Sequence, residues 1–111
     1  MARILVIDDE QSRFEGIETM LRLQSGHEIT YSTGTDALER IKEGWDTIFL
    51  DHDLGLDYTD GYELAKTISE NPPHQVIVHS MNIVGAKNIV NLLKNYVYDV
   101  RHIPYSTLVN L

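Results

Sequence analysis

Short apolar runs alternate with amphipathic stretches along the whole chain. The runs are rich in β-branched residues or alternate apolar with polar positions, so they predict strands. These strands cover residues 4–7, 27–32, 47–50, 76–78 and 98–103. The stretches between them repeat apolar residues every three or four positions, as amphipathic helices do. They predict helices over residues 11–24, 33–44, 60–71 and 84–96, the third opening with a capping box formed by Asp60 and Glu63.

Strand and helix alternate throughout, which is the pattern of an α/β fold with a parallel sheet and helices on both faces. We expect residues 1–111 to form a single domain. After Pro104 only residues 105–111 remain, so the last helix should be short or missing. One sheet face would then be covered mainly by the first helix. Because exposed apolar faces tend to be interfaces, we predict a homodimer through that face.

Composition narrows the class of protein. Apolar residues make up 42% of the chain and charged residues 23%, which excludes a disordered chain. Nine basic against seventeen acidic residues give a net charge of -8, which disfavours binding to nucleic acid. The chain has no cysteine, and its apolar runs fall short of the roughly 20 residues that span a bilayer. We expect a cytoplasmic protein that binds neither nucleic acid nor membranes.

Acidic residues and histidines follow the predicted strands at the edge where open parallel sheets bind ligands. The segments concerned are Asp8-Asp9-Glu10, Asp51-His52-Asp53, His79-Ser80-Met81-Asn82 and His102-Ile103-Pro104. Crowded carboxylates raise one another's pKa unless a cation neutralises them, and the oxygens of Asp8, Asp9 and Asp51 suit Mg²⁺. The alternative is that Asp8 and Asp9 only cap the first helix.

The sequence lacks the motifs of nucleotide-binding enzymes and of serine hydrolases, which disfavours both classes. Gly34 and Gly44 flank a helix without the spacing of a P-loop or a dinucleotide-binding motif. Ser80 lacks the Gly-x-Ser-x-Gly setting of a serine hydrolase nucleophile.

Together the motifs resemble the receiver domain of two-component response regulators. The resemblance runs over about residues 1–82 and rests on the segments 4–10, 45–51, 60–64 and 76–80. It implies a flavodoxin-like (βα)5 fold, a doubly wound, five-stranded parallel sheet with strand order 2-1-3-4-5. It also implies phosphorelay signalling, with a histidine kinase or another phosphodonor protein as partner.

The resemblance further implies a role for each residue of the rim. Asp51 would be the phospho-accepting nucleophile and a ligand of Mg²⁺ or Mn²⁺. Asp8, Asp9 and the backbone carbonyl of Asp53 would complete the protein's share of the metal shell. Ser80 and Asn82 would contact the phosphoryl group. A carboxylate can attack a phosphoryl group in line while the metal neutralises its oxygens.

The sequence departs from the receiver pattern at three points. Receivers carry a Lys before the Pro that ends strand five, but here Ile103 precedes Pro104. The loop after Asp51 is two residues longer than usual, so that counting back from Asp60 would make Asp53 the acceptor. We favour Asp51, because insertions belong in loops and the preceding strand fixes its register. The third departure is that the last helix is short or missing.

Segments 51–55 and 79–82 look like a divergent receiver branch named for proposed cyclic-phosphate processing. In that branch His79 and His102 could replace the lysine, either by donating to a phosphoryl oxygen or as a general acid. Three hypotheses follow: an atypical receiver phosphorylated on Asp51, a metal-dependent phosphoesterase assisted by both histidines, and a pseudo-receiver that only binds proteins. The missing lysine favours the second and third, whereas the intact acidic residues argue against the third.

Overall fold

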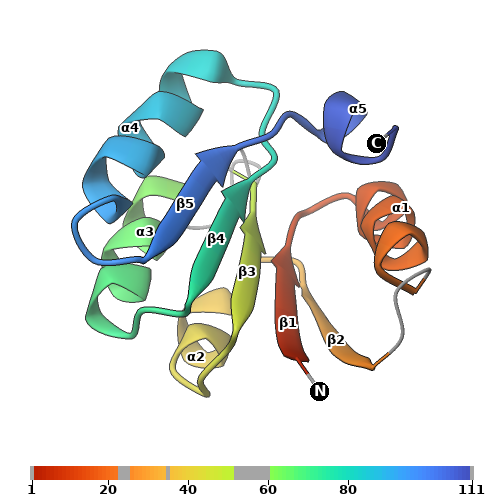
Figure 1. The fold of residues 1–111 in the computed structure, drawn as a ribbon, viewed down its shortest axis with the longest axis horizontal. Helices are drawn as coiled ribbons and strands as arrows, with labels where there is room; N and C mark the ends of the chain where they lie inside the picture. The colour runs from red at the N-terminus through yellow and green to blue at the C-terminus, as the bar shows by residue number, and fades with distance from the viewer. Residues whose placement is uncertain (1, 23–25, 35, 52–60, 111) are drawn as a thin grey trace.

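Five parallel strands form one sheet in the order β2-β1-β3-β4-β5, as Figure 1 shows for the computed structural model. The structure describes residues 2–22, 26–34, 36–51 and 61–110, except for the side chains of residues 61–63. Its elements are β1 (Ala2–Ile7), α1 (Gln11–Arg22), β2 (His27–Ser32), α2 (Ala37–Ile41), β3 (Thr47–Leu50), α3 (Gly61–Glu70), β4 (Gln75–Val78), α4 (Ile83–Leu93), β5 (Asp99–His102) and α5 (Tyr105–Leu108). The predicted fold and strand order are confirmed.

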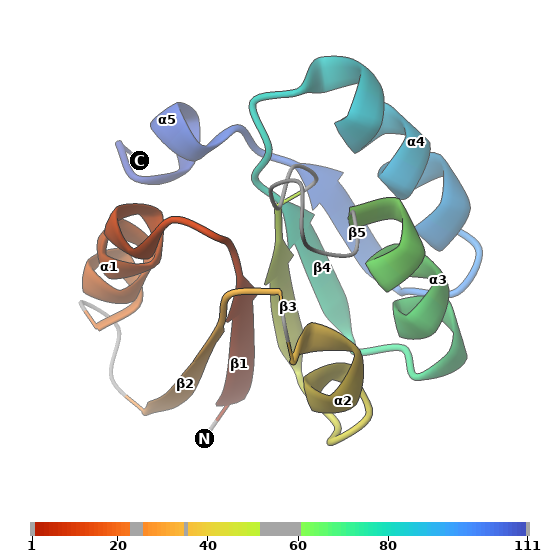
Figure 2. The same cartoon turned by 180° about the vertical axis from the view of Figure 1, so that it is seen from behind.

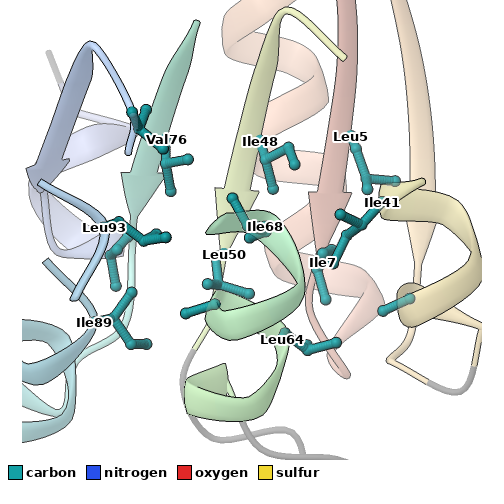
Figure 3. Packing of buried hydrophobic residues seen from close by; sticks show 14 of the residues in the cluster. Leu5, Ile7, Ile41, Ile48, Leu50, Leu64, Ile68, Val76, Ile89 and Leu93 are labelled. Atoms are coloured by element: carbon teal, nitrogen blue, oxygen red, sulfur yellow. The ribbon is translucent and has the colours of Figure 1, made fainter. Parts of the chain in front are cut away.

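Alternation along the central strands sends side chains to two separate cores. In β1, Leu5 and Ile7 join the core under α2, α3 and α4, whereas Ile4 and Val6 join the core under α1. Both sets are almost fully buried, which explains why this strand is a continuous apolar run. Figure 3 shows the larger core from close by, with side chains of the sheet meeting those of the helices.

The two faces of the sheet are covered unequally. Figures 1 and 2 show α2, α3 and α4 along one face, and α1 with the four-residue α5 on the other. The predicted short last helix is thereby confirmed. Between α1, α5 and the sheet lies a hollow of about 280 Å³ lined by apolar residues such as Ile4, Phe49 and Ile77. The homodimer expected through this face stays a prediction.

Two turns depend on glycine. Gly26 precedes β2 with φ 89°, and Gly44 follows α2 with φ 88°, a conformation that side-chain-bearing residues rarely adopt. The predicted capping box at the start of α3 lies outside the described residues. Among the helices of the described segments, none is long and apolar enough to cross a bilayer.

Candidate functional site

The sheet register brings Asp8, Asp51 and His79 together. Ile7, Leu50 and Val78 pair side by side at the ends of β1, β3 and β4. The ladder continues one residue further, because the N–H of Asp51 donates to Ile7 at 3.0 Å and that of His79 donates to Leu50 at 3.1 Å. The residue after each strand is therefore held at the same level of the C-terminal edge.

The side chains of this row form a buried cluster. Asp8, Asp51 and His79 share the strand parity of Val6, Phe49 and Ile77, so they point toward the side covered by α1. One ligand atom from each lies within 4.8 Å of the other two. The residues are only 0%, 4% and 1% exposed, which removes them from the screening of bulk water. The two carboxylates offer the oxygen ligands that a divalent cation such as Mg²⁺ takes, and the imidazole of His79 lies beside them.

Asp8 accepts four hydrogen bonds, two on each carboxylate oxygen. Oδ1 accepts from the backbone N–H of Glu10 at 2.8 Å and from Arg13 Nη2 at 2.9 Å. Oδ2 accepts from Arg13 Nε at 2.8 Å and from His79 Nε2 at 2.7 Å. An ionised carboxylate offers about four lone-pair sites, so Asp8 is fully satisfied by protein groups.

Arg13, in the first turn of α1, is the cation at the centre of the site. Besides Asp8, its Nη2 lies 3.2 Å from Asp51 Oδ2 and 3.3 Å from Asp9 Oδ1. Its Nη1 lies 3.5 Å from Glu10 Oε2. The guanidinium thus contacts four carboxylates while its side chain remains 25% exposed. These contacts raise the pKa of Arg13, and it carries its charge throughout the accessible pH range.

The two buried carboxyls differ in pKa because they have different partners. Burial, and next the negative charge of Asp8, raise the pKa of Asp51 to about 6. Burial alone would also raise the pKa of Asp8. The hydrogen bonds from His79, Arg13 and the Glu10 N–H outweigh it, and the pKa of Asp8 is lowered. Burial, and then the charge of Asp8, raise the pKa of Asp9.

In the segment after β4, Ser80 and Asn82 form hydrogen bonds with other groups of the protein. The Ser80 hydroxyl accepts the backbone N–H of Asn82 at 3.0 Å. The Asn82 side chain caps α4 by accepting the N–H of Gly85 at 3.0 Å. His102 Nε2, at the end of β5, donates to the backbone carbonyl of Ser80 at 2.7 Å. These bonds hold the loop against β5 and fix Ser80 at the rim.

The residues predicted from the sequence are brought together only in part. Asp8, Asp51 and His79 form the cluster, whereas Asp9 is not one of its members and is joined to the site through Arg13. Asp53, with the choice between it and Asp51 as acceptor, lies outside the described residues. Nothing in the structure tests the roles predicted for Ser80, Asn82 and His102.

Sequence reasoning missed Arg13. The prediction recognised that the crowded carboxylates require a cation but considered only a metal ion. The spacing offered a signal, since Asp9 and Glu10 lie four and three residues before Arg13 and such pairs meet on a helix surface. The contact with Asp51, 38 residues away, depends on the tertiary fold.

Comparison with known families and proteins gives two results from sequence. The sequence model of the family described as the cyclic-phosphate processing receiver domain matches residues 3–95. The transcriptional regulatory protein ComA of Bacillus subtilis (strain 168) is 33% identical over 85 residues. This match covers 72% of the chain and 39% of ComA, so the chain spans well under half of that curated relative.

Solved structures of response regulators have the same fold as this chain. The response regulator domain of Thermotoga maritima CheB aligns with a TM-score of 0.72 at 21% identity, covering 99% of this chain and 89% of that one. At this identity the likeness concerns the fold alone. NtrX from Brucella abortus aligns with a TM-score of 0.67 at 27% identity, covering 98% of this chain and 25% of NtrX. The resemblance predicted from the sequence motifs is confirmed.

Proposed function

We propose that this chain, which belongs to the family of cyclic-phosphate processing receiver domains, binds a divalent cation and accepts a phosphoryl group on Asp51. One observation carries the proposal. Asp8, Asp51 and His79 converge, buried, at the C-terminal edge of the three central strands. Ligands of open parallel sheets bind at this edge.

The chemistry of the donor set supports a divalent cation, Mg²⁺ or Mn²⁺. Asp8 and Asp51 would hold it, with Asp9 at the margin of the site. The raised pKa of Asp51 reflects burial beside a second carboxylate, a cost that bound positive charge would offset. His79 would orient Asp8 through the 2.7 Å hydrogen bond rather than contact the ion directly.

Asp51 would act as the nucleophile. Its carboxylate oxygen attacks the phosphorus of the donor, the bond from phosphorus to the donor's leaving group breaks, and an acyl phosphate forms on Asp51. When bound, the divalent cation supplies positive charge to the phosphoryl oxygens. We assign to the Ser80 hydroxyl, which accepts the backbone N–H of Asn82, the donation of a hydrogen bond to a phosphoryl oxygen.

We infer that the donor in the cell is a histidine kinase or another phosphodonor protein, as for response regulators generally. The acyl phosphate would form on a domain in which Ile103-Pro104, and not the usual Lys-Pro, follows β5.

Intact mass spectrometry tests the proposal. The protein is incubated with acetyl phosphate and Mg²⁺ or Mn²⁺, and we expect a single phosphoryl adduct that is absent in Asp51→Asn. Glu39→Gln is the control, since it removes an exposed carboxylate on α2 and should leave the adduct unchanged. Absence of an adduct under all conditions, or an adduct that persists in Asp51→Asn, would contradict the proposal.

A second candidate function is hydrolysis of a cyclic phosphate ester. It is favoured by the imidazole of His79 inside the acidic cluster and by the description of the family. Water would add to phosphorus, the ring P–O bond would break, and a histidine, His79 or His102, would protonate the leaving alkoxide to give a phosphomonoester. The test is turnover of a 2′,3′-cyclic nucleotide with Mn²⁺. Turnover by wild type that is lost in His79→Ala, without a phosphoryl adduct on wild type after incubation with acetyl phosphate, would separate this function from phospho-acceptance.

A further inference from the structure

We propose that Arg13 is an exchangeable internal cation: it neutralises the acidic site before metal binds, is released by the metal, and then binds the phosphoryl group in place of the missing lysine. The inference deepens the proposed function and rests on it. Arg13 lies on α1, outside the sequence segments that resemble receiver domains.

The first step follows from the hydrogen bonds of Asp8. Its four acceptor sites are filled by Glu10 N–H, His79 Nε2 and two nitrogens of Arg13. A metal ion bound by Asp8 must therefore replace at least one donor. The Glu10 N–H is backbone, and His79 is fully buried. Arg13 is the donor that can leave.

Arg13 occupies the position that the metal ion would take. Arg13 Nη2 contacts Asp8, Asp9 and Asp51 at 2.9, 3.3 and 3.2 Å, so it lies among the carboxylates that would ligate the metal. A guanidinium and a divalent cation in the same position would repel each other strongly. Metal binding and these three Arg13 contacts therefore compete.

Once released, the guanidinium of Arg13 can bind the phosphoryl group. Arg13 is anchored in the first turn of α1, within reach of Asp51, and its side chain is 25% exposed at the rim. A phosphoryl group on Asp51 would extend outward from the carboxylate with three anionic oxygens. Guanidinium binds such oxygens in a bidentate manner. Ile103, where receivers place the lysine, offers no cation.

The alternative is that Arg13 is only a structural ion pair that keeps α1 docked. A structural role predicts that its loss weakens every property of the site together. An exchangeable cation predicts changes of opposite sign: metal should bind more tightly without Arg13, and a phosphoryl mimic should bind more weakly.

The first measurement is Mn²⁺ affinity by isothermal titration calorimetry, with wild type, Arg13→Gln and Arg13→Lys. Arg13→Gln should bind Mn²⁺ at least about tenfold more tightly, because a charge in direct contact with the ligands is removed. Arg13→Lys should stay closer to wild type because it keeps the charge. Arg22→Gln is the matched control: it removes the same charge from the exposed end of α1, where Arg22 pairs with Glu18, and should leave Mn²⁺ affinity unchanged.

The second measurement is beryllofluoride binding at saturating Mn²⁺, as a mimic of the phosphoryl group. Arg13→Gln should lose about tenfold or more in beryllofluoride affinity, since a charge-assisted contact is missing. Circular dichroism and thermal melting confirm beforehand that each variant is folded.

The outcomes separate the two proposals. If wild type and Arg13→Gln both fail to bind Mn²⁺, the proposed function fails, and this inference with it. If wild type binds Mn²⁺ but Arg13→Gln binds it equally or more weakly, only the exchange is refuted. If Mn²⁺ binding tightens while beryllofluoride affinity is unchanged, the phosphoryl role of Arg13 is refuted.

Discussion

Replacing Asp51 by asparagine should stabilise the metal-free protein, and only above mildly acidic pH. The Asp51 side chain is 6% exposed, and burial followed by the charge of Asp8 raises its pKa from 3.8 to about 6. The folded state therefore holds a proton between these two pH values that the unfolded state has released. As pH rises through this window, ionised Asp51 increasingly destabilises the fold.

The size of the effect follows from the same values. A difference of about two between the folded and unfolded pKa corresponds to about 3 kcal/mol of destabilisation once Asp51 is fully ionised. The introduced asparagine side chain would resemble the protonated acid in shape and charge. We therefore expect Asp51→Asn to raise the free energy of unfolding by about 2 to 3 kcal/mol near pH 8, and by almost nothing near pH 4.

Urea unfolding followed by circular dichroism, in a metal chelator and across this pH range, measures the effect. Asp36→Asn is a control of opposite sign. The hydrogen bond from Ser32 lowers the pKa of Asp36. Burial acts in the opposite direction, but a hydrogen bond from Arg40 adds to the lowering. Asp36→Asn should therefore be less stable than wild type at neutral pH and converge with it in acid. If Asp51→Asn destabilises the protein at pH 8, or shifts stability equally at both pH values, the charge argument is wrong.

Three further variants test the packing around the site. Leu50→Ala removes a fully buried side chain of β3 and should lower the free energy of unfolding by about 2 to 5 kcal/mol in urea denaturation; a loss below about 1 kcal/mol would contradict tight packing there. His79→Ala leaves a buried carboxylate without one donor and should cost about 1 to 3 kcal/mol in the same assay, whereas His74→Ala, at an exposed residue, should change little. Gly16→Ala would place a methyl group against the Tyr105 hydroxyl and push α5 away from α1. The amide hydrogens of α5 should then exchange faster than in wild type. Adding Tyr105→Phe, which removes the hydroxyl, should restore part of the protection. Unchanged exchange in Gly16→Ala would show that α5 does not depend on this contact.

Much of the fold was accessible from the sequence because the periodicity of apolar residues is a local property. The run Ile4–Ile7 alternates between two apolar cores, so it had to be a strand covered on both sides. Parallel strands end at one edge, and residues that follow them meet there. This rule alone was enough to predict that Asp8, Asp51 and His79 share a rim.

The tertiary structure decided which members of the rim touch. The register of Ile7, Leu50 and Val78 aligns Asp8, Asp51 and His79 in one row, and a one-residue slip would have turned their side chains to the opposite face. Burial raises the pKa of Asp51, whereas the hydrogen bonds from His79, Arg13 and the Glu10 N–H outweigh burial at Asp8 and lower its pKa.

The sequence by itself determined the layered α/β fold and the concentration of acid at one edge. Each of these depends on local periodicity or on where the strands end. Only the tertiary structure decided that Arg13 on α1 is the cation of that edge, and that His79 is committed to Asp8. These contacts join residues as far as 71 positions apart, and such distances are set by the packing of helices on the sheet.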